Sequence, residues 1–477
     1  MNFDKKIIFG YDVMTYNGEI PNCLHPKFLN TIYQASDFDY SMSGEYFLKR
    51  WNVGWHIYNS NFWNRYVDKK SVYDIVNNFQ NKQWFYVVEP FGSMESFFGN
   101  HNVFNELILK NISSVALNEI KNGCGNLLIN YIIDGGEGMT KTNFDKLISF
   151  TRENGIPDEK VFLIFQDFNL ESNLKKLGVN YNVINFNLAH LSKSQEFNNT
   201  IKNPGWKYWG EGSHETQIGK VESEAGSIAT YDEFEKSIGS QKKDFLFLCR
   251  HWKLHRLLIL SKLHKLGKLF NSNTSWDKSF SHPNLIEEFL KHDPNPDLID
   301  IITNVSKTLD VSDITKIAGY GFENKSIYLN SYLSIVSESM FFQRKENIDT
   351  FVDFPTGYLS EKIWKPIWYG QPFILIGRPG SLKYLKELGF KTFDWLINEY
   401  YDNIENNEER FRFVMNEINR INVIDINKIK DKIKENFADL EHNRKLLEQI
   451  GKDRDTYEYK LYKKIKNFKN EKDYNVF

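Results

Sequence analysis

Cationic side chains stand beside expected helix starts in the second half of the chain. Arg250 directly follows an apolar run at residues 245–249, and Arg256 falls in the first turn of the helix expected next. Lys362 stands beside the start of another helix, expected over residues 361–368. Helix starts carry a partial positive charge and disfavour cations unless an anion lies nearby. Because helix-start amides and arginine side chains both bind anions, the pattern predicts a diphosphate site, although solvated surface cations would have the same spacing.

Two carboxylates of the same region could accept hydrogen bonds from the hydroxyl groups of a sugar or a ribose. Glu338 ends an apolar run at residues 333–338, and Glu361 begins the helix that Ser360 is expected to cap. Acidic residues are also common at helix starts without any ligand, because they complement the helix dipole. Each carboxylate is therefore a candidate ligand contact with a purely structural alternative.

Apolar runs of strand length alternate with helix-period segments along most of the chain. This alternation is typical of parallel sheets covered by helices and predicts the α/β class. The expected strands are residues 6–10, 84–89, 127–134, 161–166 and 181–186 in the first half, and 245–249, 326–329, 333–338 and 373–377 in the second. The expected helices are residues 103–120, 143–153, 254–266, 361–368, 381–388 and, in a charged stretch, 426–462.

The length of 477 residues, roughly three times the commonest domain size, favours two packed domains. The strand and helix pattern restarts at residue 245 after a polar stretch without periodicity. We expect an N-terminal α/β domain at residues 1–190, an interdomain crossover at 191–244, a C-terminal α/β domain at 245–425 and a charged helix or tail at 426–477. Ligands in such sheets bind at the carboxyl ends of strands, which favours an enzyme with two lobes and a cleft between them.

One motif of the C-terminal half resembles a known family. Residues 358–362 (YLSEK), followed by residues 370–377 (GQPFILIG), are similar to the donor-binding motif of GT-B glycosyltransferases of the α-1,3-fucosyltransferase type. The family pattern is Tyr-Val-Thr-Glu-Lys, then a helix and an apolar strand ending in glycine; here Leu359 and Ser360 replace valine and threonine. Residues 245–256 also resemble the strand and arginine-bearing loop that face the diphosphate in that superfamily.

The resemblance implies a GT-B architecture of two Rossmann-like lobes with a cleft between them, in which the C-terminal domain binds the nucleotide sugar. It implies that Glu361 binds the ribose and that Tyr358 lines the nucleotide pocket. It also implies that Lys362, with Arg250 or Arg256, holds the diphosphate. The donor would be a GDP- or UDP-linked sugar acting as co-substrate, and no separate cofactor is expected.

The leading hypothesis is a glycosyltransferase that moves a sugar from this donor to a hydroxyl of a glycan acceptor, with inversion and without a metal. The long segment at residues 276–320 departs from the family pattern, so the sequence does not identify the transferred sugar as fucose. Two alternatives keep the same fold. One is a phage or viral enzyme that glycosylates hydroxymethylated DNA bases, with nucleic acid as the acceptor. The other is a non-catalytic protein that binds glycans or nucleotides.

An inverting transfer needs a carboxylate general base for the acceptor hydroxyl. We expect it at a strand end of the N-terminal domain, where the candidates are Glu89, with Glu95 close by, and Asp134 or Glu137 in the segment DGGEG. Glycine allows close approach of a substrate, but a simple turn would have the same composition. The sequence has no Asp-X-Asp arrangement at a strand end and no His/Cys cluster at ligand spacing, so we expect no required metal.

The composition is that of a folded protein in a reducing compartment. Hydrophobic residues make up 41% and charged residues 26%, which excludes a disordered chain. A net charge of -2 gives no overall attraction for polyanions, although a local basic cleft remains compatible with it. Three cysteines, an odd number, exclude a complete disulfide framework. We find no membrane span and no signal peptide in the sequence and expect a cytoplasmic protein.

Overall fold

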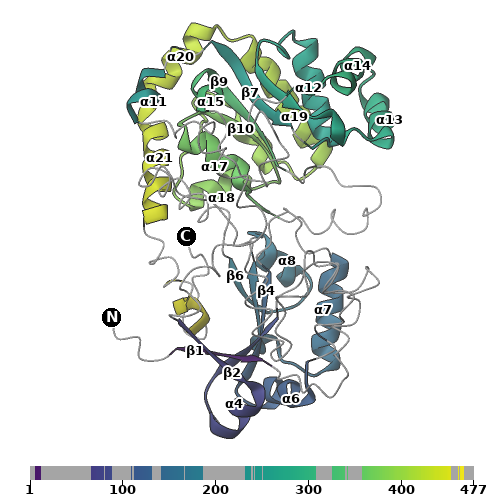
Figure 1. The fold of residues 1–477 in the computed structure, drawn as a ribbon, viewed down its shortest axis with the longest axis vertical. Coiled ribbons are helices and arrows are strands. Elements are labelled where there is room, and N and C mark those ends of the chain that lie inside the picture. Colours follow the sequence, from purple (N-terminus) through teal and green to yellow (C-terminus); the bar gives the residue numbers. More distant parts are fainter. Residues whose placement is uncertain are drawn as a thin grey trace, which may run out of the picture. The chain divides into compact units, whose positions relative to one another are not determined.

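The chain folds into two compact units (Figure 1). The N-terminal unit comprises Met1–Leu188, Lys345–Gly357 and Arg454–Phe477, and the C-terminal unit comprises Ala189–Arg344 and Tyr358–Asp453. The computed structural model describes residues 6–11, 66–79, 81–88, 109, 112–131, 141–165, 167–185, 231–237, 240, 242–249, 251–307, 325–338, 341, 357–452, 460 and 462–466. The chain passes between the units more than once, whereas the sequence predicts a single crossover at residues 191–244.

A six-stranded parallel sheet forms the centre of the N-terminal unit. Its strand order is β2-β1-β3-β4-β5-β6, and every neighbouring pair is parallel. The chain runs from β1 to β2 on one side and then returns to the other side of β1 to form β3, so the order reverses between β1 and β3. The strands are β1 (Ile7–Tyr11), β2 (Val67–Ser71), β3 (Trp84–Val88), β4 (Gly125–Tyr131), β5 (Val161–Phe165) and β6 (Asn182–Asn185).

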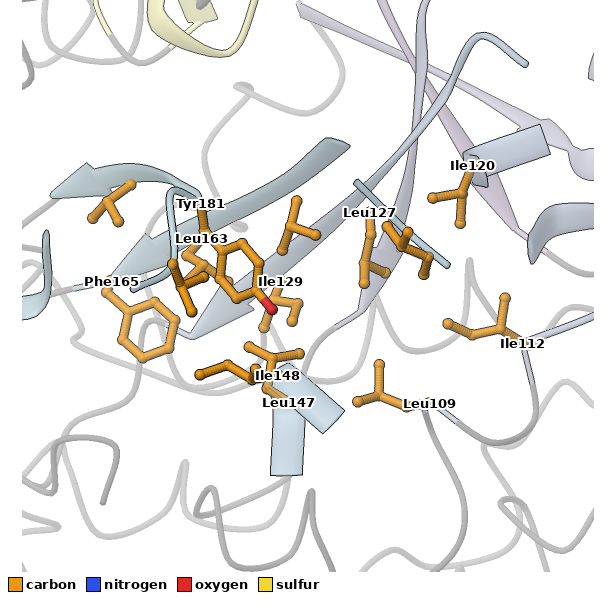
Figure 2. Close-up of a cluster of buried hydrophobic side chains, with 14 of the residues drawn as sticks. Leu109, Ile112, Ile120, Leu127, Ile129, Leu147, Ile148, Leu163, Phe165 and Tyr181 are labelled. Atoms are coloured by element: carbon orange, nitrogen blue, oxygen red, sulfur yellow. The ribbon is translucent and has the colours of Figure 1, made fainter. Parts of the chain in front are cut away.

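Helices α4 (Val72–Asn78), α6 (Ser114–Asn122), α7 (Lys141–Glu153) and α8 (Leu170–Lys176) belong to the same unit, together with a short 3-10 helix, η4 (Asp158–Lys160). Serines cap two of them: the hydroxyl of Ser71 accepts the Asp74 N–H and that of Ser113 accepts the Ala116 N–H. The core lies between the sheet and the helices, where apolar side chains of β4, β5, α6 and α7 meet. Figure 2 shows this cluster, which includes Ile120, Leu127, Ile129, Leu147, Ile148, Leu163 and Phe165.

A four-stranded parallel sheet forms the centre of the C-terminal unit, in the order β10-β9-β7-β8. Its strands are β7 (Lys243–Cys249), β8 (Asn273–Trp276), β9 (Ser331–Ser337) and β10 (Phe373–Ile376). Figure 1 shows α12, α13 and α14 gathered on one side of this unit and α11 and α21 on the other. The helices are α11 (Tyr231–Ser237), α12 (Leu254–Lys265), α13 (Pro283–His292), α14 (Pro296–Asn304), α15 (Lys325–Leu329), α17 (Glu361–Trp368), α18 (Ser381–Glu387), α19 (Asn407–Asn422), α20 (Ile426–Glu435) and α21 (Phe437–Lys452), with 3-10 helices η5 (Lys278–Phe280) and η8 (Glu399–Asn403).

These sheets confirm the predicted α/β class with parallel strands. The apolar runs at residues 245–249 and 373–377 contribute β7 and β10 to one sheet, as expected. The expected strand at residues 326–329 is wrong, because these residues form helix α15, closed by a hydrogen bond from the Asn330 N–H to the Ser326 carbonyl. A short run such as Ser326–Leu329 (SIYL) does not distinguish a strand from one helical turn.

The charged C-terminal stretch divides between the two units. Helices α20 and α21 belong to the C-terminal unit, where α21 packs against α17 and buries Leu440 and Leu447. The following segment returns to the N-terminal unit, where the ring of Tyr462 stacks on that of Tyr66 at 4.9 Å between centroids. Residues 426–452 are therefore part of the packed C-terminal unit and do not form a solvated tail. Within the described residues, no helix has the length and apolar character needed to cross a membrane.

Candidate functional site

The strand order of the C-terminal unit reverses between β7 and β9. The chain leaves β7 through α12 toward β8 on one side, and it leaves β9 through α17 toward β10 on the other. The β7–β9 ladder reaches only the pair Leu246 and Ser334, whereas β9 stays paired with β10 as far as Ser337 and Ile376. In open α/β sheets a ligand binds at such a reversal of strand order.

Two side chains at the start of α12 contact the end of β9. The guanidinium of Arg256 donates from Nη2 to the Ser337 carbonyl at 3.1 Å, from Nε to its hydroxyl at 3.3 Å and from Nη1 to the His251 carbonyl at 2.9 Å. The neighbouring His255 ring lies with Nε2 3.1 Å from the Glu338 carbonyl. Arg256, expected to hold the diphosphate, thus uses these donors on protein groups, at the end of β9 and at the His251 carbonyl after β7.

Glu338 connects the end of β9 to the start of α17. Its Oε1 accepts the Ser360 N–H at 2.9 Å and its Oε2 accepts the Ser360 hydroxyl at 2.5 Å. The ammonium of Lys362 lies 3.0 Å from the Ser360 hydroxyl and 3.9 Å from Oε2 of Glu338. The cation at this helix start therefore has a carboxylate of the same chain beside it. The sequence argument, which attributes the unfavourable placement of Lys362 to a bound anion, does not need the anion for that purpose.

Local contacts explain why helix α17 forms where it does. The hydroxyl of Ser360 accepts the Lys362 N–H at 3.3 Å and caps the helix, and Trp364 and Trp368 are fully buried on its inner face. Gly370 has φ 61°, in the left-handed region that favours glycine, and terminates the segment. The motif at residues 358–362 thus ends in a capped first turn at the carboxyl edge of the sheet.

Buried cations surround this edge. Arg256, Arg378 and Arg410 are all at least nine-tenths buried, and the Arg410 guanidinium lies 4.7 Å from the centre of the Phe341 ring. Burial, with a smaller contribution from the charge of Arg378, lowers the pKa of Arg410 to about 10. Burial, together with Arg256 and other nearby cations, holds the pKa of His255 well below its usual 6.5. The charges of these arginines would favour a bound anion at this edge.

The other predicted site residues are described only in part. Tyr358 is half-buried immediately before α17, and Glu361 is the first residue of that helix. Glu338 is at the predicted strand end, but the contacts the structure gives its carboxylate are to protein groups. Outside the described residues lie the side chain of Glu361 and all of Arg250, Glu89, Glu95, Asp134 and Glu137.

Sequence reasoning missed His255, Arg378 and Arg410. Arg378 follows β10 by two residues, so the rule that selected Arg250 after β7 would also have selected Arg378. His255 stands next to Arg256 but offers no separate sequence signal. Arg410 lies within helix α19, where an arginine is ordinary, and only the folded structure brings it to Phe341.

In the part of the chain that the structure describes, no group of three or more His, Cys, Asp or Glu side chains is placed to hold a metal ion. No protein-family model, no curated protein and no solved structure matches this chain. Its function is therefore inferred from the motif resemblance and from the geometry of its own residues.

The buried His255 predicts a loss of stability in acid. Because the folded protein keeps this imidazole neutral, only the unfolded chain takes up a proton as the pH falls below 6.5, so the free energy of unfolding should decrease there and stay level above it. His255→Gln should flatten this decrease, since an amide can still donate to the Glu338 carbonyl. Denaturant unfolding between about pH 5 and about pH 8 measures it. The exposed His282 provides the control, and an equal flattening in His282→Gln would contradict the assignment.

Proposed function

We propose that this chain is a nucleotide-sugar-dependent glycosyltransferase of the GT-B type, which transfers a sugar with inversion to a hydroxyl of a glycan acceptor. One observation carries the proposal. The motif that resembles a donor-binding motif lies at the start of α17, at the carboxyl edge of a parallel sheet. Glu338, which follows β9, accepts two hydrogen bonds from Ser360 of this motif, and the strand order reverses between β9 and its neighbour β7. The resemblance and the strand topology, which are independent, thus select the same edge.

The chemistry of the transfer matches the charges at this edge. A departing nucleoside diphosphate gains negative charge in the transition state, and cations placed beforehand stabilise that charge. Lys362 reaches solvent, with 30% of its side chain exposed, and Arg250 follows β7 at the adjacent strand end. Arg256 donates to the His251 carbonyl after β7 and to the Ser337 carbonyl at the end of β9. Glu361 and Tyr358 would contact the ribose and line the nucleotide pocket.

The N-terminal unit would supply the general base. Glu89 directly follows Val88, the last residue of β3, and β3 is one of the two strands between which the order of this sheet reverses. Asp134 and Glu137 follow β4, one strand further from the reversal. Glu89 is therefore the first of the three candidates to test. The proposed donor is a GDP- or UDP-linked sugar. The proposed compartment is the cytoplasm, where the reducing conditions would keep Cys124 and Cys249 as free thiols.

A thermal-shift screen against GDP, UDP, dTDP and CMP tests the donor class without knowledge of the acceptor, because a ligand that binds the folded state raises the melting temperature. We expect one nucleoside diphosphate to raise it and the others to have less effect. The matching nucleotide sugar, incubated with the protein, should then release this nucleotide when a glycan acceptor is added. A protein that binds no nucleotide in the screen would contradict the proposal.

Removing the two charged motif residues should weaken binding of the nucleotide found in the screen. Lys362→Ala loses a charge-assisted contact to the diphosphate, and Glu361→Ala loses the ribose contact, each worth about 1.5–3 kcal/mol in titration calorimetry. Because Lys362 also lies beside Glu338, its removal should lower stability slightly, by about 0.5–1 kcal/mol, so melting is measured in parallel. Lys383, an exposed lysine in the first turn of α18, is the matched control. Wild-type affinity in both motif variants would mean that the donor site lies elsewhere.

Turnover should need no divalent ion. The reason is that the sequence offers lysine and arginine at the diphosphate and no metal-ligand motif, so cationic side chains would stabilise the leaving group. We expect the transfer rate in excess EDTA to equal the rate without it. Activity that disappears in EDTA and returns only with Mn²⁺ or Mg²⁺ would show that the lysine-and-arginine account is wrong.

A further inference from the structure

The hydroxyl of Ser360 joins three groups at the start of α17. It donates to Oε2 of Glu338 at 2.5 Å, and it lies 3.0 Å from the ammonium and 3.3 Å from the backbone N–H of Lys362. The Ser360 N–H is occupied as well, since it donates to Oε1 of the same carboxylate at 2.9 Å. Ser360 is 2% exposed and Glu338 3%, so this set of contacts is built into the protein interior.

The direction of the Ser360 hydroxyl follows from what each partner can do. An ionised carboxylate only accepts hydrogen bonds and a lysine ammonium only donates them, whereas a hydroxyl does both. The Ser360 hydroxyl therefore donates its single hydrogen bond to Glu338, and the oxygen lone pairs are left to accept from Lys362. The buried carboxylate thus orients a serine, and the serine in turn presents an acceptor to the lysine.

This arrangement restrains a side chain that is otherwise flexible. Lysine loses more rotamer entropy than most residues when it is fixed, and a ligand that must order it binds less tightly. With Nζ at the Ser360 hydroxyl and part of the side chain exposed, the ammonium is already ordered and still accessible to solvent. A ligand anion arriving there would not have to order the lysine.

We propose that Ser360, oriented by Glu338, is a positioning residue that holds the ammonium of Lys362 in place for the diphosphate of the nucleotide sugar. The proposal rests on the proposed function and deepens it. Ser360 touches no substrate in this role, and it acts through Lys362. The hydroxyl, rather than the size of the side chain, is the essential feature.

The test compares Ser360→Ala with Ser360→Thr, which keeps the hydroxyl. The probes are the nucleoside diphosphate from the screen and the same nucleoside without phosphate. Ser360→Ala should weaken diphosphate binding about tenfold and leave nucleoside binding unchanged, and Ser360→Thr should restore the affinity. Ser113→Ala, which removes the cap of α6 in the other unit, should lower stability as a lost cap does and leave both affinities unchanged. Equal loss of diphosphate and nucleoside binding in Ser360→Ala, or no loss of either, would overturn the positioning role.

A second measurement separates this proposal from the proposed function. Ser360→Ala should speed the acetylation of Lys362 by acetic anhydride, followed by mass spectrometry, relative to that of the exposed Lys383. A wild-type protein that binds no nucleotide would overturn the proposed function and the role at the diphosphate together. Normal nucleotide binding with an unchanged acetylation rate of Lys362 in Ser360→Ala would overturn the positioning role alone.

Discussion

Replacing the general base by its amide should lower kcat by about 10² to 10⁴ while the affinity for the donor stays at the wild-type value. The variants are Glu89→Gln, Asp134→Asn and Glu137→Gln, and one of them should show this loss. An amide has nearly the shape of the carboxylate but cannot take the proton of the acceptor hydroxyl. The donor site, on the other unit, should not respond. Steady-state transfer rates and calorimetry with the identified nucleotide provide the two readouts.

The position of β3 makes Glu89 the first variant to measure. Its strand flanks the reversal of order in the six-stranded sheet, where a substrate is expected to approach the carboxyl ends. Glu153→Gln, at an exposed site at the end of α7, controls for the general effect of removing one charge from this unit. If the variants of Glu89, Asp134 and Glu137 all keep near-normal kcat, the base lies elsewhere and Glu95 is tested next.

The buried strands could be predicted from the sequence, and the polar edge strands could not. Strand β5 (VFLIF) is buried along its whole length and is a continuous apolar run in the sequence. Strands β2 (VDKKS) and β8 (NTSW) are the last strands in the order of their sheets, where polar residues are tolerated. Their sequences contain no apolar run, and only their pairing with β1 and β7 identifies them as strands.

The position of Lys362 could be predicted, but its partner could not. A helix start can be recognised from a capping serine and the periodicity that follows, and both place Lys362 in the first turn of α17. Glu338, by contrast, is remote from Lys362 in the sequence. The two side chains lie close together only because β9 ends beside α17. Arg256 shows the same limit, since its acceptors on β9 are remote in sequence. Sequence spacing gives a residue's place in its own element, and tertiary packing decides what its side chain contacts.

Glu338→Ala should lower the free energy of unfolding by about 2–4 kcal/mol, because the buried N–H and hydroxyl of Ser360 would lose their acceptor. This outcome distinguishes the two roles of Glu338. A carboxylate that only accepts hydrogen bonds from a sugar or ribose, as the sequence suggests, would be dispensable for folding. One that fastens α17 to β9 would not be. Denaturant unfolding of the protein without nucleotide measures the difference.

A double-mutant cycle that combines Glu338→Ala with Lys362→Ala measures how much of the stabilisation by Glu338 depends on Lys362. Because Glu338 orients the Ser360 hydroxyl that accepts from Lys362, the two residues belong to one hydrogen-bonded set, and the two single losses should add only in part. Glu287→Ala, which removes an exposed glutamate paired with Lys291 on α13, should leave stability nearly unchanged. Wild-type stability in Glu338→Ala, combined with weakened binding of the nucleotide sugar, would mean that Glu338 contacts the ligand and does not stabilise the fold. It would also remove the support on which Ser360 and Lys362 are proposed to depend.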